Sequence, residues 1–330
     1  MFRSLIFSMA IGLGAVQFSQ AQDKLVASYP AAGGTQGPLW AAKDLGIFDK
    51  YGLSVDVVLV PGSARSIQAL LANSIQVVQG DPSAPIIAAS RGAEIAIIAQ
   101  PLDKFPFTFL TQKHIQKPSD LIGKKIGILN FGGATEVAVT VALREWNIPL
   151  QSVTMLPIGG ISNRFTALLN GSIDATVLVP PENFVAARKG MNVLAQLSDL
   201  KTAFPYTVVT VSRSFMKRNS TIIKRYVQAY SEAIFHFKTD SSKAKAVYAK
   251  RLGQRDTQAI QEAYDYYAPR FTFPPRPDPK ALRAVLDFER ERIPESRGQI
   301  DVRQSIDDSA FDELDKEGFF KKLSDARAGR

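Results

Sequence analysis

The residues best suited to ligand chemistry stand in short turns that follow apolar runs. The first turn, residues 30–37, holds Gly33, Gly34, Thr35 and Gln36. It separates the apolar run 25–29, which predicts a buried strand, from a helical pattern that starts at Pro38. A strand, a glycine-bearing turn and a helix together aim free backbone N–H groups at one point above the sheet edge. This geometry suits a small anionic or polar ligand.

The same order of strand, turn and helix recurs along the chain. This recurrence strengthens the prediction that the first turn contributes to a ligand site. One such turn is common in α/β proteins, but several of them would meet at the carboxyl ends of the strands, where these sheets bind ligands. The residues predicted to contact a ligand are Tyr29, Gly33, Gly34, Thr35, Gln36, Ser63, Asp81, Gly132, Gly133, Thr135, Ser162, Asn163 and Glu182.

The polar residues in these turns have an alternative role as helix caps. Ser63 and Thr135 stand where an N-cap residue is expected, and so do Ser162 and Asn163. Asp81 precedes a proline that could open a helix. Capping and ligand binding are therefore both open for these side chains.

Four charged side chains near the turns bear on the charge of the ligand. Asp81 and Glu182 could cap helices, lie recessed behind an anion, or face a positive group on the ligand. Arg65 and Arg164 follow the expected caps by one or two residues, and they could neutralise an anion or face solvent. The sequence leaves these alternatives open.

No set of residues predicts a catalytic or metal centre. His114 and His236 are the only histidines, no Asp or Glu is spaced around them as metal ligands would be, and there is no cysteine. The nucleophile-elbow, P-loop, zinc-protease and dinucleotide motifs are missing as well. We therefore expect a binding protein without catalytic residues, metal or cofactor. An exported enzyme on the same scaffold is the alternative from another class.

Composition and the N-terminus bear on location and partners. The chain has 330 residues and a net charge of +9, but its basic residues are interleaved with acidic ones, so we expect no nucleic-acid partner. Arg3, an apolar run at 5–16 and small residues at Ser19 and Ala21 predict a signal peptide, residues 1–21, cleaved after Ala21. The mature protein is then expected to be soluble and exported.

Two series of alternating strands and helices predict an α/β fold with mostly parallel sheets. Two similar segments, 105–111 (FPFTFLT) and 204–210 (FPYTVVT), flank the second series. Either the similarity is chance, or these segments are the two crossings between lobes. On the second interpretation, the predicted boundaries are lobe 1 at 22–104 and 212–330, lobe 2 at 112–203, and hinge strands at 105–111 and 204–211.

Four longer stretches carry a resemblance to a known family. They are 38–56 (PLWAAKDLGIFDKYGLSVD), 66–78 (SIQALLANSIQVV), 120–128 (DLIGKKIGI) and 167–181 (ALLNGSIDATVLVPP). Together they resemble the substrate-binding proteins of bacterial ABC importers, in the NMT1/THI5-like group of nitrate, sulfonate and taurine receptors. The resemblance implies a two-lobed periplasmic-binding-protein type II fold, with helices on both faces of each sheet and a ligand cleft between the lobes.

The same resemblance implies a function and its partners. We expect a periplasmic receptor that captures a small organic anion, such as a sulfonate, a taurine-like molecule or a carboxylate. We expect it to be a monomer that delivers this ligand to the transmembrane subunits of an ABC permease. A neutral heteroaromatic, such as a thiamine-pyrimidine precursor, is the alternative ligand. The cysteine-rich motif and the histidine of the thiamine-pyrimidine synthase relatives have no counterpart in this sequence.

Overall fold

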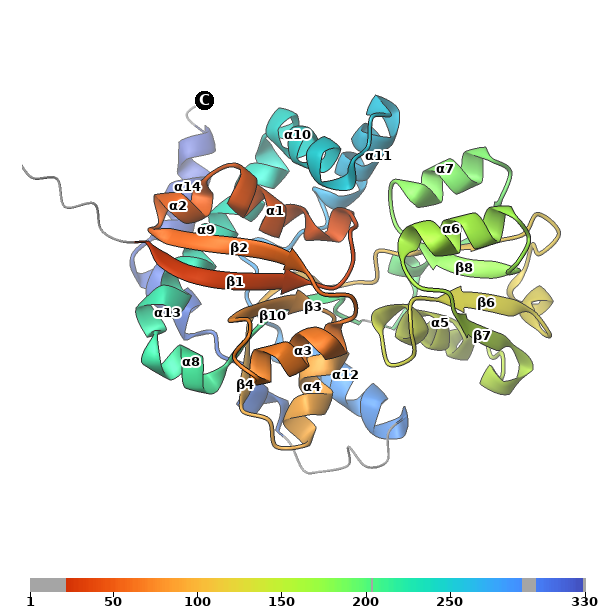
Figure 1. Ribbon diagram of the computed structural model, residues 1–330, viewed down its shortest axis with the longest axis horizontal. Helices are drawn as coiled ribbons and strands as arrows, with labels where there is room; N and C mark the ends of the chain where they lie inside the picture. Colours follow the sequence, from red (N-terminus) through yellow and green to blue (C-terminus); the bar gives the residue numbers. More distant parts are fainter. Residues whose placement is uncertain (1–21, 203, 293–300, 329–330) are drawn as a thin grey trace, which may run out of the picture.

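The computed structural model describes residues 22–202, 204–292 and 301–328, so the expected signal peptide lies outside the described residues. The chain forms two lobes, each built on a five-stranded sheet (Figure 1). The strand order is β2-β1-β3-β10-β4 in the larger lobe and β7-β6-β8-β5-β9 in the smaller one. In both sheets the fourth strand of this order, β10 or β5, runs against the other four. This is the mostly parallel α/β fold that the sequence predicts.

The sheet of the larger lobe is covered by helices on both faces. Its strands are β1 (Asp23–Tyr29), β2 (Leu53–Leu59), β3 (Val77–Gly80), β4 (Ile95–Leu102) and β10 (Thr207–Ser212). One face carries α1 (Gly37–Asp44), α2 (Ile47–Lys50) and α9 (Ser220–Thr239), and the other carries α3 (Ser63–Leu71), α4 (Ser83–Ser90) and α12 (Pro279–Arg292) (Figure 1). Both faces of β4 are therefore buried, which explains why it reads as a nearly unbroken apolar run.

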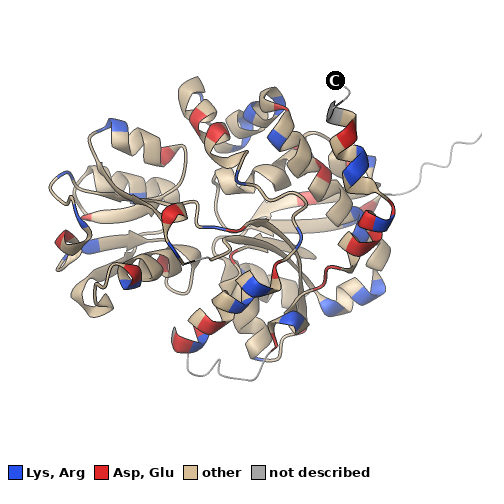
Figure 2. Ribbon diagram, turned by 180° about the vertical axis from the view of Figure 1, so that it is seen from behind, with Lys and Arg blue, Asp and Glu red and all other residues tan. Residues whose placement is uncertain are grey.

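The remaining C-terminal helices also belong to the larger lobe. They are α8 (Arg213–Arg218), α10 (Ser241–Leu252), α11 (Thr257–Tyr267), α13 (Ser309–Lys316) and α14 (Phe319–Ala328). None of the helices that the structure describes is long and apolar enough to cross a membrane. Helices α8 and α10 carry Lys and Arg without Asp or Glu, α11 carries only acidic charges, and α13 and α14 carry both signs (Figure 2).

A buried acid ties α2 to α9. Glu232 of α9 accepts hydrogen bonds from Lys50 Nζ at 2.7 Å and from the Tyr51 hydroxyl at 2.5 Å, and His236 Nε2 lies 3.3 Å from it. Burial alone would raise the pKa of Glu232. The hydrogen bonds from His236, Lys50 and Tyr51 outweigh burial and lower this pKa to about 2.

The smaller lobe repeats the arrangement with fewer helices. Its strands are β5 (Thr108–Thr111), β6 (Lys125–Ile128), β7 (Thr154–Pro157), β8 (Ala175–Leu178) and β9 (Asn192–Gln196). Helix α5 (Ala134–Glu145) covers one face, and α6 (Ile161–Leu169) and α7 (Glu182–Arg188) cover the other. Short 3₁₀ helices complete the chain at η1 (Gly34–Gln36), η2 (Pro118–Leu121), η3 (Leu150–Ser152), η4 (Leu197–Asp199) and η6 (Val302–Ser305).

The two similar segments of the sequence lie side by side where the chain passes between the sheets. The chain leaves the larger sheet after β4 and enters the smaller one at β5, then returns from β9 to β10. Phe105 stacks on Phe204 with ring centroids 4.8 Å apart, and Phe107 meets Tyr206 edge to face at 5.1 Å. Equivalent aromatic residues of the two segments therefore contact each other. That these segments act as a hinge stays a prediction.

Candidate functional site

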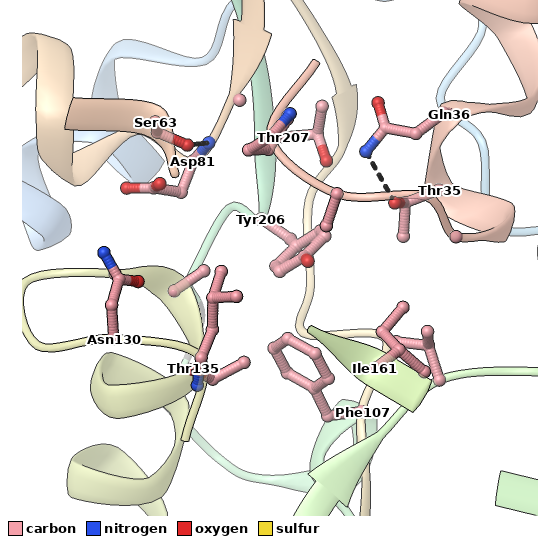
Figure 3. Close-up of a pocket in the computed structure, with 18 of the residues that line it drawn as sticks. Thr35, Gln36, Ser63, Asp81, Phe107, Asn130, Thr135, Ile161, Tyr206 and Thr207 are labelled. Carbon is pink, nitrogen blue, oxygen red and sulfur yellow. Dashed lines mark hydrogen bonds between the residues drawn. The ribbon is translucent and has the colours of Figure 1, made fainter. Parts of the chain in front are cut away.

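A cavity lies between the two lobes and holds about 610 Å³ of space that protein atoms do not fill. This space includes open solvent. Turns at the ends of β1, β2 and β3 supply the wall on the larger lobe, and turns at the ends of β6 and β8 supply much of the opposite wall (Figure 3). The walls therefore come from the strand-to-helix turns that the sequence singles out.

The predicted ligand contacts fall into three groups. Seven of them line this cavity: Gly33, Thr35, Gln36, Ser63, Asp81, Gly133 and Thr135. Three line an adjoining, more open pocket that shares Ile161 and Leu129 with the cavity: Ser162, Asn163 and Glu182. Three line neither of these two pockets: Tyr29, Gly34 and Gly132.

Each residue of the last group has another structural role. The ring of Tyr29 meets Trp40 edge to face, with centroids 5.6 Å apart. A Cβ at Gly34 would clash with the ring of Tyr267. Gly132 has a φ of +76°, which favours glycine in the turn before α5.

Two threonine hydroxyls face the cavity with their oxygens already accepting hydrogen bonds. Thr35 Oγ1 accepts from Gln36 Nε2 at 3.1 Å (Figure 3), and Thr135 Oγ1 accepts from the Leu129 N–H at 2.8 Å. Neither hydroxyl donates to another residue within the described ranges. A hydroxyl has one O–H donor, so each threonine can donate a hydrogen bond to a ligand atom in the cavity.

The capping alternative is wrong for Ser63 and Thr135. The N-cap residues of α3 and α5 are Gly62 and Gly133, and neither helix has a side-chain cap. Ser63 instead fixes Asp81: its Oγ accepts from the Asp81 N–H at 3.1 Å, as Figure 3 shows. Ser63 therefore holds the acid in the wall, and its own contact with a ligand stays a prediction.

Arg164 is a buried cation in the wall of the smaller lobe. The alternative left open by the sequence, that it faces solvent, is therefore wrong. Arg164 is 2% exposed, and it donates from Nε to the Gly159 carbonyl at 3.0 Å and from Nη1 to the Val177 carbonyl at 2.5 Å. No carboxylate of the described chain forms an ion pair with it. Burial lowers its pKa to about 10, so it stays protonated at neutral pH. The charge of Glu182 favours the protonated form of Arg164 without a direct ion pair, so the guanidinium can still hold an anion beside it.

Three further titratable groups surround this cation. Burial raises the pKa of Asp81, which is 6% exposed, although Ser63 and nearby backbone N–H groups oppose the shift. Burial also raises the pKa of Glu182, opposed by its own backbone N–H and by Arg164. The pKa of Tyr206 rises through burial and the charge of Asp81, so Tyr206 is a neutral hydroxyl. The guanidinium of Arg164 therefore stays protonated, and the raised pKa values of Asp81 and Glu182 favour their neutral forms.

Phe107, Tyr206 and Asn130 also line the cavity, and none of them was among the predicted ligand contacts. Phe107 and Tyr206 stand directly after the prolines of the two crossing segments, so the repeated aromatic–proline–aromatic pattern was the available signal. Asn130 follows β6, and a Cβ at Gly133 would come 2.5 Å from its Oδ1. The space beside Gly133 is thus filled by Asn130 (Figure 3), whose Oδ1 is buried and has no hydrogen-bond partner in the part of the chain that the structure describes.

Within residues 22–202, 204–292 and 301–328, no group of three His, Asp or Glu side chains could hold a metal ion.

Known proteins resemble this chain in sequence and in fold. YtlA of Bacillus subtilis (strain 168), whose name describes it as a candidate binding protein, is 23% identical over 267 residues, which cover 77% of this chain and 80% of YtlA. The periplasmic aliphatic sulphonate binding protein SsuA of Escherichia coli superposes with a TM-score of 0.72 at 20% identity, covering 86% of this chain and 97% of SsuA. This likeness shows the periplasmic-binding-protein fold.

The same fold also occurs in an enzyme. The desulfurization enzyme DSZB superposes with a TM-score of 0.63 at 17% identity, covering 90% of this chain and 100% of DSZB. Membership of a family is decided by the family model described as NMT1/THI5 like, which matches residues 35–243. These residues contain most of the cavity lining, except Pro30, Ala31 and Gly33 of the first turn, and they make up more than half of the chain. The protein therefore belongs to the NMT1/THI5-like family.

Proposed function

We propose that this protein is a periplasmic receptor of an ABC importer. It captures a small organic anion, such as a sulfonate, a taurine-like molecule or a carboxylate, and delivers it to the transmembrane subunits of a permease. The observation that carries the proposal is Arg164, a protonated guanidinium buried in the cleft wall without an ion pair in the described chain. The sulphonate-binding neighbour and the family membership support it.

The groups around the cleft are sufficient for a transport receptor. A micromolar ligand requires a binding free energy of about −8 kcal/mol. Hydrogen bonds to a charged ligand contribute roughly 1.5–3 kcal/mol each. Arg164, Thr35, Thr135 and Tyr206 line the cavity as donors from both lobes. Four such donors contribute roughly 6–12 kcal/mol together. The upper end of this range still leaves about 8 kcal/mol after an association cost of about 4 kcal/mol.

Asp81 is compatible with an anion for either of two reasons. Its raised pKa favours the neutral acid, which donates a hydrogen bond instead of repelling the ligand. Alternatively its carboxylate faces a positive group on a zwitterionic ligand. Measuring affinity against pH separates the two, because the neutral-acid arrangement weakens as pH rises and Asp81 ionises.

Two other functions remain as alternatives. The rings of Phe107 and Tyr206 line the cavity and would suit a neutral heteroaromatic. Such a ligand would leave Arg164 without a direct ion-pair partner in the described chain, so this function comes second. An enzyme would need a nucleophile and a base, and neither His114 nor His236 lies among the residues that line the cavity.

A ligand panel tests the proposal. The mature protein is heated with ethanesulfonate, taurine, propanoate or the uncharged ethanesulfonamide, and its melting temperature is compared with that of the free protein. A receptor for anions is stabilised by at least one anion and not by ethanesulfonamide. Mass spectrometry of the recovered ligand then separates a receptor, which returns it unchanged, from an enzyme. Stabilisation by ethanesulfonamide alone would contradict an anion receptor.

A further inference from the structure

A buried chain of hydrogen bonds runs from the middle of α9 to the cavity. The Tyr230 hydroxyl donates to Gln79 Oε1 at 2.5 Å, and Gln79 Nε2 donates to Gln36 Oε1 at 2.5 Å. Gln36 Nε2 then donates to Thr35 Oγ1 at 3.1 Å. None of these four residues is more than 3% exposed. Of the four, only Thr35 and Gln36 line the cavity, so Tyr230 and Gln79 act from outside it.

Tyr230, at the end of the chain away from the cavity, determines which partner donates in each of these hydrogen bonds. Each glutamine has one acceptor oxygen and one donor nitrogen, so reversing one bond reverses all of them. In the reversed chain, Gln79 would donate to Tyr230 Oη, and the Tyr230 proton would be left buried without an acceptor. Burying an unpaired hydroxyl is costly, and burial raises the pKa of Tyr230, so this proton is retained. The Tyr230 proton therefore selects the observed direction.

The direction decides what Thr35 offers to a ligand. As observed, Thr35 Oγ1 accepts from Gln36, and its own proton is free for an acceptor in the cavity. In the reversed chain, Thr35 would donate to Gln36 and present only lone pairs, which repel the oxygens of an anion. We propose that Tyr230 is a positioning residue that holds Thr35 as a hydrogen-bond donor, so that the cleft selects ligands with acceptor groups. This inference rests on the proposed function, because it takes the ligand to be an anion.

The neighbouring Tyr226 supplies a matched control. It lies one turn earlier on α9, its ring is stacked on Tyr230 with centroids 6.1 Å apart, and it is equally buried. Its hydroxyl has no hydrogen-bond partner in the part of the chain that the structure describes. Tyr226→Phe therefore changes the same kind of atom in the same surroundings without touching the chain of hydrogen bonds.

The test combines binding with a double-mutant cycle. Calorimetric titration with ethanesulfonate is run on the wild type, Tyr230→Phe, Tyr226→Phe, Thr35→Val, and the double variant Tyr230→Phe/Thr35→Val. We expect Tyr230→Phe to weaken binding by roughly 5- to 20-fold, as for partial loss of a hydrogen bond to a charged group. Tyr226→Phe should leave affinity unchanged. The double variant should bind like Thr35→Val alone, because Tyr230 acts only through Thr35.

Two results would overturn the inference. One is additive losses in the double variant, and the other is an equal loss in Tyr226→Phe, since either result would mean a general packing effect. A ligand-free measurement keeps the inference separate from the proposed function. The side-chain amide NMR signals of Gln36 and Gln79 should change in Tyr230→Phe and not in Tyr226→Phe. If ethanesulfonate fails to bind the wild type, the proposed sulfonate ligand is wrong. Independently of binding, unchanged amide signals in Tyr230→Phe would refute the proposed role of Tyr230 in the hydrogen-bond chain.

Discussion

Replacing Thr135 with valine removes one hydroxyl from the cleft while keeping the volume of the side chain. The structure predicts two separate consequences. The ligand loses a donor, which costs about 1.5–3 kcal/mol for a charged acceptor, or roughly 10- to 150-fold in affinity. The Leu129 N–H also loses its acceptor at 2.8 Å, which lowers the free energy of unfolding by about 1–3 kcal/mol.

The assay measures both quantities on the same variant. Calorimetric titration with ethanesulfonate gives the affinity, and urea unfolding gives the stability. Thr140→Val is the control, because Thr140 lies on the same helix, is 2% exposed and does not line the cavity. We expect Thr140→Val to leave affinity unchanged. Wild-type affinity in Thr135→Val, together with lowered stability, would show that Thr135 only braces the backbone and would refute its role in binding.

Three further predictions concern other parts of the molecule. Because the folded-state pKa of Glu232 lies below its ordinary value of 4.5, its ionised form stabilises the fold above that pH, and this stabilisation is lost as pH falls toward 2. The stability advantage of the wild type over Glu232→Gln in urea should therefore be large at pH 7 and shrink at pH 3, and an advantage independent of pH would count against it. If 105–111 and 204–211 form a hinge, a bound ligand should reduce the radius of gyration in X-ray scattering, whereas superimposable curves with and without bound ligand would argue against a hinge. The exported protein should begin at Gln22 by intact mass, and a mass that still includes residues 1–21 would contradict export with cleavage after Ala21.

The fold could be predicted from the sequence because its signals are local. The apolar runs that became β1 and β6 each end in a glycine-bearing turn before a helical pattern, and these features lie within a few residues of one another. The break between α1 and α2 was not anticipated. Gly46 adopts a left-handed φ of +68° there and ends the first helix, whereas the apolar spacing continues across it.

The site could be predicted only in part, because its chemistry depends on contacts between distant residues. The turns containing Thr35 and Thr135 were recognisable, but which of their atoms are free depends on the partners those hydroxyls have. The sequence leaves open whether Arg164 neutralises an anion or faces solvent, and only the packing of the smaller lobe buries it. The bond from Tyr230 to Gln79 joins residues 151 positions apart, and no local pattern encodes it.

If the cleft binds an anion at Arg164, changing the charge of this side chain should weaken binding in calorimetric titration. Wild type, Arg164→Gln, Arg164→Lys and the exposed control Arg65→Gln are titrated with the anion that stabilises the protein most in the ligand panel. We expect Arg164→Gln to lose roughly 10- to 150-fold in affinity, as for one hydrogen bond to a charged group. Arg164→Lys should recover part of this loss, and Arg65→Gln should bind like the wild type. Melting temperatures confirm that each variant is folded. Wild-type affinity in a folded Arg164→Gln variant would show that the ligand is not held by this guanidinium.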